Sequence, residues 1–293
     1  MQRNRTHTSL LRRSLSACFR LKNWWSAVFT LAALCMSAGI ATATEPCGEL
    51  DECKALIEIN ATDGDVGFHF LADADNLLQL FVRAPDGTQV YKALAKGHLW
   101  DQTFTETFVE SAEPLCWFDP EGDPDDIVIT LEEFLGRWPQ GRYLFVGADI
   151  DAERVRGRTT LDYELPAAPA DVEYDDATGI ISWAPGDDLG ECASRARLNR
   201  LVNDGVLPKH PKDVVVMTWE VVFEPEDGSG HEFGVRVPGD QMQVTVPLDY
   251  RNALPDDTPV KIEVGAITAT DNATFTEEGG ICINEVEGCE EDD

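Results

Sequence analysis

The stretch Thr103-Phe104-Thr105-Glu106-Thr107-Phe108-Val109 decides the fold class, because its apolar and polar side chains alternate along the chain. A period of two places successive side chains on opposite faces of an extended strand and is typical of a strand with one buried face. Similar runs lie on both sides of it, at residues 56–59, 66–70, 80–83 and 143–146. The Asp-Gly pairs at 63–64 and 86–87 favour tight turns between antiparallel neighbours. Residues 44–165 are therefore expected to form an antiparallel β-sandwich.

A Pro- and Ala-rich segment, Leu165 to Ala170, follows this first strand set and predicts a short, stiff linker. Before it, one helix is expected to begin after Thr130, which forms a capping box with Glu133, and to end by Pro139. Beyond it, a second strand set is expected at residues 180–183, 214–223, 233–237, 242–246, 260–264 and 273–275. This density of short strands is typical of a sandwich.

The second strand set resembles a fibronectin type III domain over residues 167–282. Gly179-Ile180-Ile181-Ser182-Trp183-Ala184-Pro185 is similar to that family's second strand, with its buried tryptophan and a proline two residues later. The residues that match the family's penultimate strand are Leu254, Thr258, Val260, Ile262, Val264 and Ala266. The resemblance implies a domain of this kind at residues 166–282. The motifs of residues 44–165 identify no family, and this region is interpreted as another immunoglobulin-like sandwich.

The sequence departs from the family's pattern at three places. Val260 replaces the usual tyrosine, which removes the corner hydrogen bond that a phenol would make. Pro255 lies one position early, and residues 186–213 form a long connection with an expected helix from Cys192 to Val202. The fold class expected from the sequence is all-β: two immunoglobulin-like or fibronectin type III-like antiparallel β-sandwich domains with short helical insertions, after a signal peptide.

Residues 1–43 have the organisation of a Sec-type secretory signal, with a basic start, an apolar run and a small-x-small cleavage site. The start holds six Lys and Arg residues and no acid, the apolar run is Ser26 to Met36, and the cleavage site is Ala41-Thr42-Ala43. The alternative is an uncleaved anchor, because the 20 residues from Trp24 to Ala43 could just span a bilayer. The short apolar run favours cleavage. A secreted or periplasmic protein without membrane insertion is therefore expected.

The composition is strongly acidic, with 23 Lys and Arg residues against 54 Asp and Glu residues and a net charge of −31. Because the signal carries six of those basic residues and no acid, its removal lowers the net charge to −37. A surface this negative repels phosphate backbones, which excludes unaided nucleic-acid binding and disfavours anionic membranes. Residues 283–293 are expected to form an acidic, solvated tail.

Six of the eight cysteines follow the signal: Cys47, Cys53, Cys116, Cys192, Cys282 and Cys289. An even number in an exported chain favours disulfides. The close pairs Cys47 with Cys53 and Cys282 with Cys289 would each pin one end of the chain, and Cys116 would then pair with Cys192 by elimination. Other connectivities stay open. Zinc is the weaker alternative, because the sequence has no Cys-x-x-Cys motif.

Calcium is the one cofactor for which the sequence offers a candidate site. Residues 119–126 hold five carboxylates and lead into the expected helix, and Ca²⁺ takes about six to eight oxygen ligands, often from such a loop. The candidate ligands, by their similarity to EF-hand positions, are Glu121, Asp123, Asp125 and Glu132. Asp126 stands where that turn needs glycine. A solvated acidic loop before a capped helix is the simpler interpretation. Two further acidic clusters are Asp63-Gly64-Asp65 and Asp73-Ala74-Asp75.

The sequence lacks the short motifs of the common catalytic sites, including the Gly-x-Ser-x-Gly elbow, the phosphate-binding loop and the His-Glu-x-x-His helix. His69, in an expected strand, and His231, after a turn, are interpreted as structural or solvated. Trp183 and Trp219 lie within expected strands and are assigned to the cores, whereas Trp100 lies in an expected loop.

These observations predict an exported, non-enzymatic binding or scaffold module at the bacterial envelope or outside the cell, with a protein or glycan partner and no cofactor. One alternative is a calcium-stabilised, adhesin-like surface protein. The other is an accessory protein or hydrolase with a site in the N-terminal domain. The sign of a hydrolase would be a polar pocket that holds two carboxylates with shifted pKa values.

Overall fold

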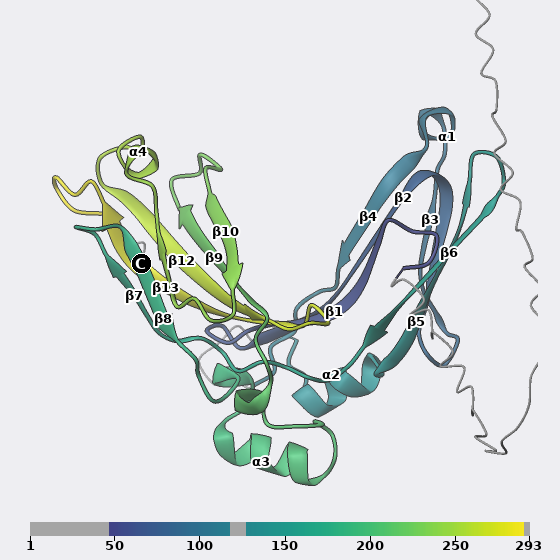
Figure 1. The fold of residues 1–293 in the computed structure, drawn as a ribbon, viewed down its shortest axis with the longest axis horizontal. Helices are drawn as coiled ribbons and strands as arrows, with labels where there is room; N and C mark the ends of the chain where they lie inside the picture. The colour runs from purple at the N-terminus through teal and green to yellow at the C-terminus, as the bar shows by residue number, and fades with distance from the viewer. Residues whose placement is uncertain (1–46, 118–126, 290–293) are drawn as a thin grey trace, which may run out of the picture. The chain divides into compact units, whose positions relative to one another are not determined.

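The computed structural model describes residues 47–117 and 127–289. Every element named below belongs to the unit that begins at Thr44. Strands dominate the described residues (Figure 1), which confirms the β-rich class expected from the alternating pattern. None of their helices has the length and apolarity needed to cross a membrane.

The first strand set is built around one long strand. Its strands are β1 (Glu52–Asn60), β2 (Asp65–Arg83), β3 (Gln89–Leu94), β4 (Phe104–Glu110), β5 (Gly141–Asp149) and β6 (Arg154–Leu161). The first half of β2 pairs with β1 and β4, and its second half pairs with β3 and β5. The sequence predicted two separate strands here. The structure joins them into one strand that is interrupted by a register shift near Asn76, whose φ of 57° asparagine tolerates well.

A first hydrophobic core fills the space between these strands. Its largest fully buried side chains include Ile57 and Ile59 of β1, Phe68 and Leu80 of β2, and Tyr143 and Phe145 of β5. Each strand contributes alternate residues, as the period of two requires. Burial of one such side chain contributes about 1.5–3 kcal/mol to folding.

Two helices accompany the first strand set, α1 (His98–Gln102) and α2 (Leu131–Arg137). Helix α2 begins as the capping box predicts, because the Thr130 hydroxyl accepts a hydrogen bond from the Glu133 amide at 3.2 Å. Its apolar face buries Phe134 and Leu135 in the first core. It ends at Trp138, whose ring stacks on Phe68 at 4.0 Å between centroids.

The second strand set forms two sheets. Its strands are β7 (Ala170–Asp175), β8 (Ile180–Ala184), β9 (Thr218–Pro225), β10 (Phe233–Pro238), β11 (Gln243–Thr245), β12 (Thr258–Ile267) and β13 (Ala273–Ile283). Strands β7, β8 and β11 form a small sheet, and the others belong to a large one. A second core includes Trp183 and Trp219, both buried as expected and 5.8 Å apart between centroids.

Short helices connect the second strand set. They are α3 (Arg195–Asn203), α4 (Leu248–Arg251) and two single 3-10 turns (Gly190–Cys192 and Pro211–Asp213). The helix expected from Cys192 to Val202 is therefore present, but it begins three residues later because a 3-10 turn holds Cys192. Leu198 and Leu201 of α3 are buried in the first core rather than in the second.

The two strand sets share one sheet of ten strands, in the order β10-β9-β12-β13-β1-β2-β5-β6 with β3 and β4 also paired to β2. The join is a short parallel pairing of Glu58–Asn60 with Ala273–Phe275 (Figure 1). The expected division into two separate antiparallel sandwiches does not describe this mixed sheet. The alternation of residues predicts strands, but it does not say that β1 and β13, more than 200 residues apart, become neighbours.

Asn272 and the Pro-rich segment hold this join together. The fully buried Asn272 side chain accepts a hydrogen bond from the Ile57 amide at 2.9 Å and donates to the Asp162 carbonyl at 3.1 Å. The hydroxyls of Thr274 and Thr276 donate to carbonyls of the segment Leu165–Ala170, each at 2.7 Å. That segment, expected to be a linker, is buried from Leu165 to Pro169 and lies along β13.

The six cysteines form three disulfides, Cys47–Cys53, Cys116–Cys192 and Cys282–Cys289, with the pairing expected from the sequence. Cys116 and Cys192 are both buried in the first core. Three disulfides indicate an oxidising, extracytoplasmic environment.

Candidate functional site

Only one of the four calcium ligands proposed from the sequence lies within the described residues. Glu121, Asp123 and Asp125 lie outside the described ranges. Glu132, in the first turn of α2, accepts a hydrogen bond from the Arg197 guanidinium at 2.6 Å. Partial burial opposes ionisation of Glu132, but the Arg197 hydrogen bond outweighs it and lowers the pKa of this carboxyl. Glu132 therefore serves an ion pair between α2 and α3.

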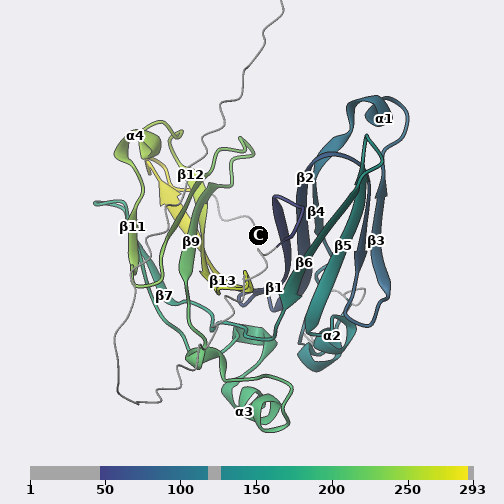
Figure 2. The same cartoon turned by 45° about the vertical axis from the view of Figure 1, so that its right-hand side comes forward.

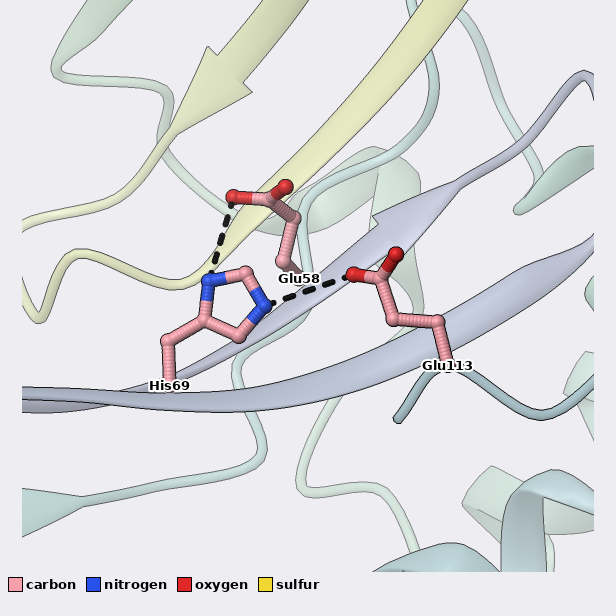
Figure 3. A group of neighbouring side chains, drawn as sticks. All are labelled: Glu58, His69 and Glu113. Atoms are coloured by element: carbon pink, nitrogen blue, oxygen red, sulfur yellow. Dashed lines mark hydrogen bonds and ion pairs between the residues drawn. The ribbon is translucent and has the colours of Figure 1, made fainter. Parts of the chain in front are cut away.

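A different group, Glu58, His69 and Glu113, gathers on the outward face of the large sheet (Figure 3). Its position begins with the Asp63-Gly64 turn. Asn60 Oδ1 accepts hydrogen bonds from the Thr62 and Asp63 amides, and Gly64 takes a φ of 77° that glycine allows at no steric cost. This turn fixes the register of β1 against β2.

The register then determines which side chains meet. Glu58 lies opposite Gly67, and Leu56 lies opposite His69. Since side chains of directly opposed residues share a face, Glu58 and His69 are diagonal neighbours on the outward side. Phe68, between Gly67 and His69, points the other way into the first core.

Glu113 reaches the same place from beyond the end of β4. Glu110 lies directly opposite His69 in the β2–β4 pairing. Ser111 then fixes the chain to β2, because its hydroxyl accepts a hydrogen bond from the Phe68 amide at 2.9 Å and its own amide donates to the Phe68 carbonyl at 3.1 Å. These contacts place Glu113 beside Gly67 and His69.

The two imidazole nitrogens face different carboxylates. Nε2 of His69 lies 3.4 Å from Oε1 of Glu113, and Nδ1 lies 3.8 Å from Oε2 of Glu58 (Figure 3). The imidazole is buried, with its side chain 5% exposed, whereas each carboxylate is about one third exposed. One ligand atom from each of the three residues lies within 4.8 Å of the others.

Gly67 supplies the space that this arrangement needs. A Cβ atom on Gly67 would lie 2.7 Å from both Oε1 of Glu113 and Nε2 of His69. Any other residue at this position would therefore force the closest ligand pair to move.

Burial raises the pKa of two carboxyls on this face, Glu58 within the cluster and Asp65 beside it. Burial is the main cause that raises the pKa of Glu58 to about 7, with the charge of Glu113 adding to it and His69 opposing it. Burial, together with Glu113 and Asp63, likewise raises the pKa of Asp65 to about 7. For His69, burial disfavours the charged ring, but the hydrogen bond to Glu113 and the charges of Glu58 and Glu110 outweigh burial and raise its pKa.

Glu113 also borders a cavity of about 510 Å³ whose lining is mainly apolar and includes Leu115, Ile129, Phe134 and Trp138. The chemistry of the cluster itself is that of a nitrogen and oxygen donor set. Imidazole with carboxylates suits Zn²⁺, Mn²⁺ or Fe²⁺, whereas Ca²⁺ prefers oxygen ligands alone.

Sequence reasoning interpreted His69 as structural or solvated and did not connect it with Glu58 or Glu113. A signal for the first pair was present, because the Asp63-Gly64 turn between two alternating runs predicts a hairpin that brings residues 58 and 69 to one face. The position of Glu113 had no such signal, since it follows a separate strand and a chain reversal. Trp100, expected in a loop, is 56% exposed and lies on α1.

No protein-family model matches the chain, and no curated protein matches it significantly.

Proposed function

We propose that this chain is an exported, disulfide-braced, non-enzymatic binding protein that holds a divalent transition-metal ion between His69 and Glu113. One observation carries the metal site. Two ligand atoms about 2.1 Å from an ion and at the tetrahedral angle lie about 3.4 Å apart, and Nε2 of His69 lies 3.4 Å from Oε1 of Glu113. The closest donor pair thus already has the separation that zinc requires.

Glu58 and Glu110 complete the site in two different roles. A histidine binds an ion through one ring nitrogen, and a carboxylate near the other nitrogen commonly orients the ring. Glu58, 3.8 Å from Nδ1, takes this positioning role. Glu110, opposite His69 on β4, adds a further carboxylate on the same face. The remaining coordination positions are left to water or to a partner's side chain.

The wider assignment rests on the disulfides and on the second core. Three disulfides support secretion or export to a periplasm. A fibronectin type III-like domain at residues 166–282 is supported by the burial of Trp183 between the small sheet and the strands of the large one. Such modules present binding loops on a rigid β-framework, which suits a binding or scaffold role.

Thermal unfolding of the purified protein tests the metal site. Zn²⁺ and Mn²⁺ should raise the melting temperature at matched ionic strength, because an ion at 100 times its Kd adds about 2.7 kcal/mol to stability. Glu113→Gln should abolish the rise. The matched control is Glu106→Gln, which removes an exposed carboxylate from the face of β4 that also carries Glu110, without touching the cluster.

Cobalt provides an independent readout, because tetrahedral Co²⁺ absorbs visible light strongly when it replaces zinc. The proposal predicts that absorption in the unmodified protein and in the Glu106 variant, and its loss in the Glu113 variant. Equal responses of both variants would contradict the site. A rise with Ca²⁺ alone would instead support the calcium-stabilised, adhesin-like alternative and its candidate loop.

A hydrolase is the second candidate, favoured by the two carboxylates, Glu58 and Asp65, whose pKa values are raised to about 7. Groups that titrate near neutral pH suit general acid and base roles. Turnover of ester, glycoside or peptide substrates that is lost in Glu58→Gln, and kept in Glu106→Gln, would establish it. Absence of turnover would leave the binding role.

A further inference from the structure

The second half of β2 lies beside β3 and β5, and β6 lies beside β5, in one part of the large sheet (Figure 2). The outward face of these strands has an unusual composition. The registers align its side chains in three rows across the strands. From β3 to β6 the rows are Gln89, Arg83, Leu144 and Arg158; Lys92, Phe81, Val146 and Arg156; and Leu94, Gln79, Ala148 and Arg154. The three positions of β5 are apolar, those of β6 are all arginine, β2 and β3 add Arg83 and Lys92, and these rows contain no acid.

This face concentrates positive charge on a very acidic protein. With Arg142, the next outward residue of β5, it holds six of the 17 Lys and Arg residues that follow Ala43. Over the same part of the chain, acids outnumber bases by 37. The basic residues are therefore concentrated on this face, although the composition of the chain as a whole is acidic.

The basic side chains are largely available to a ligand. Among the residues that the structure describes, the exposed Arg154 and Arg156 form no ion pair. Arg83 donates only to the Gly87 carbonyl, at 3.2 Å, and Lys92 lies 5.5 Å from the Phe81 ring centroid. A guanidinium that lacks a carboxylate within its own chain can bind one on a ligand through two parallel hydrogen bonds.

A groove of about 370 Å³ runs over the middle of this face. Arg83 and Arg154 are its only charged lining residues; Gln79 and Gln89 add amides, and Phe81, Val146 and Ala148 form an apolar floor. Its volume lies at the lower end of the range of about 300–1,000 Å³ for small-ligand sites. Two cationic ends, amide donors and acceptors, and a flat apolar floor together match a chain of carboxylated sugars.

We propose that this groove binds a short segment of an acidic glycan, with Arg83 and Arg154 pairing to its carboxylates and the two glutamines to its hydroxyls. The apolar floor packs against the faces of the sugar rings. This inference is independent of the metal site, which lies on the first half of β2.

The face favours a glycan over other anions. Backbone groups of β2 and β5 are already paired within the sheet, so an extended peptide would find no main-chain partners here. Phe81 is the one aromatic residue in the three rows, whereas single-stranded nucleic acids stack successive bases on several aromatic side chains. The acidic remainder of the molecule repels an extended anionic membrane.

Binding of a polyuronate oligomer, measured by titration calorimetry at fixed ionic strength, tests the proposal. The control ligand is the same oligomer with its carboxylates methyl-esterified. The double variant Arg83→Gln/Arg154→Gln should weaken binding of the polyuronate at least about tenfold, since charge-assisted hydrogen bonds exceed neutral ones by this order. Binding of the unmodified protein should also weaken with added salt.

The matched control variant is Arg200→Gln/Lys212→Gln, which removes the same two charges from exposed positions outside the groove. Its affinity for the polyuronate should lie within about twofold of that of the unmodified protein, because the two removed charges lie outside the groove and salt screens their effect on the ligand. Equal losses in both double variants, equal affinity for the esterified oligomer, tighter binding of poly-glutamate, or no binding of the polyuronate would each overturn the proposal. Unfolding midpoints of both variants show that each is folded.

Discussion

The two halves of β2 present opposite chemistry on the same outward side of one strand. Odd-numbered residues point outward in both halves of β2, which are separated by register shifts between Asp73 and Gln79. In the first half these residues include Asp65, Gly67 and His69, beside the carboxylates of Glu58 and Glu113. In the second half they are Gln79, Phe81 and Arg83, beside the arginines of β6. The net charge of the chain conceals this division, because it averages over the two surfaces.

The difference arises from the strands that flank each half. In its first half β2 pairs with β1 and β4, which place glutamates toward solvent. In its second half it pairs with β3 and β5, and β6, which pairs with β5, places Arg154, Arg156 and Arg158 on the same side. The core side of the strand is apolar throughout. Stability thus comes from one face of β2, and recognition is divided along the other.

Loss of the Cys116–Cys192 disulfide should lower stability more than any other change proposed below. Its effect on binding should be confined to the metal site on the first half of β2. The bond closes a loop with a sequence separation of 76 residues, so Cys116→Ser/Cys192→Ser should lower the free energy of unfolding by about 4 kcal/mol in the chain-entropy model. Metal affinity should fall too, because Glu113 lies three residues before Cys116. Denaturant titration measures the first effect and calorimetry the second.

The matched comparison is Cys47→Ser/Cys53→Ser, which opens a loop with a separation of only six residues and should cost about 2 kcal/mol. Polyuronate binding should survive in the Cys116/Cys192 variant. If the groove lost affinity as strongly as the metal site, the two halves of β2 would not be independent.

Asn272→Ala should have the next largest effect, because it leaves the buried Ile57 amide without its acceptor at the join of β1 and β13. A buried donor without a partner costs about 1–3 kcal/mol. Hydrogen exchange should accelerate in β1 near Ile57 and stay unchanged in β5 and β6. Uniform acceleration would mean that the join and the basic face open together.

Gly67→Ala should weaken metal binding on the first half of β2 and leave polyuronate binding on the second half unchanged. Its methyl group would displace the closest donor pair, so affinity for Zn²⁺ should fall at least about tenfold, while overpacking lowers stability by about 1–2 kcal/mol. Polyuronate binding should not change. Gly136→Ala, at a helical position with open space around it, is the control and should leave metal affinity intact.

Glu58→Gln should have the smallest effect, and its sign depends on pH. Folding raises the pKa of Glu58 to about 7, so between pH 4.5 and 7 the folded state binds more protons than the unfolded state and stability falls as pH rises. The Glu58→Gln variant has no ionisable carboxyl at this position, so its stability does not fall in this way. With chelator present, it should match the unmodified protein near pH 4.5 and exceed it by about 1–2 kcal/mol at pH 8, a value reduced for the partial exposure of the carboxylate.

Urea titrations across this pH range measure the difference. A Glu58 variant that is less stable at pH 8 would show that the ion pair with His69 outweighs the cost of burial. The Arg83→Gln/Arg154→Gln variant should show no pH-dependent difference over this range, because neither arginine titrates there.

Local signals made much of the fold predictable. The capping box at Thr130 predicted the start of α2, the alternating runs predicted most strands, and the even number of cysteines after Ala43 predicted three disulfides. Strands β3 and β6 were missed, since their residues alternate weakly. Strand β7 was missed although its residues alternate, because it begins at the end of the segment expected to be a linker. Of the candidate site, the sequence contained only the hairpin that aligns Glu58 with His69.

By itself, the sequence determined the β-rich class and the excess of negative charge, because each depends on residue type and short-range spacing, and it favoured the disulfide pairs without excluding other connectivities. Only the tertiary structure decided that β1 pairs with β13, that Glu113 lies over Gly67, and that six basic residues share one face. These features depend on register between strands distant in sequence. Many pairings bury equivalent apolar faces, so the choice among them is set by packing and buried hydrogen bonds rather than by local pattern.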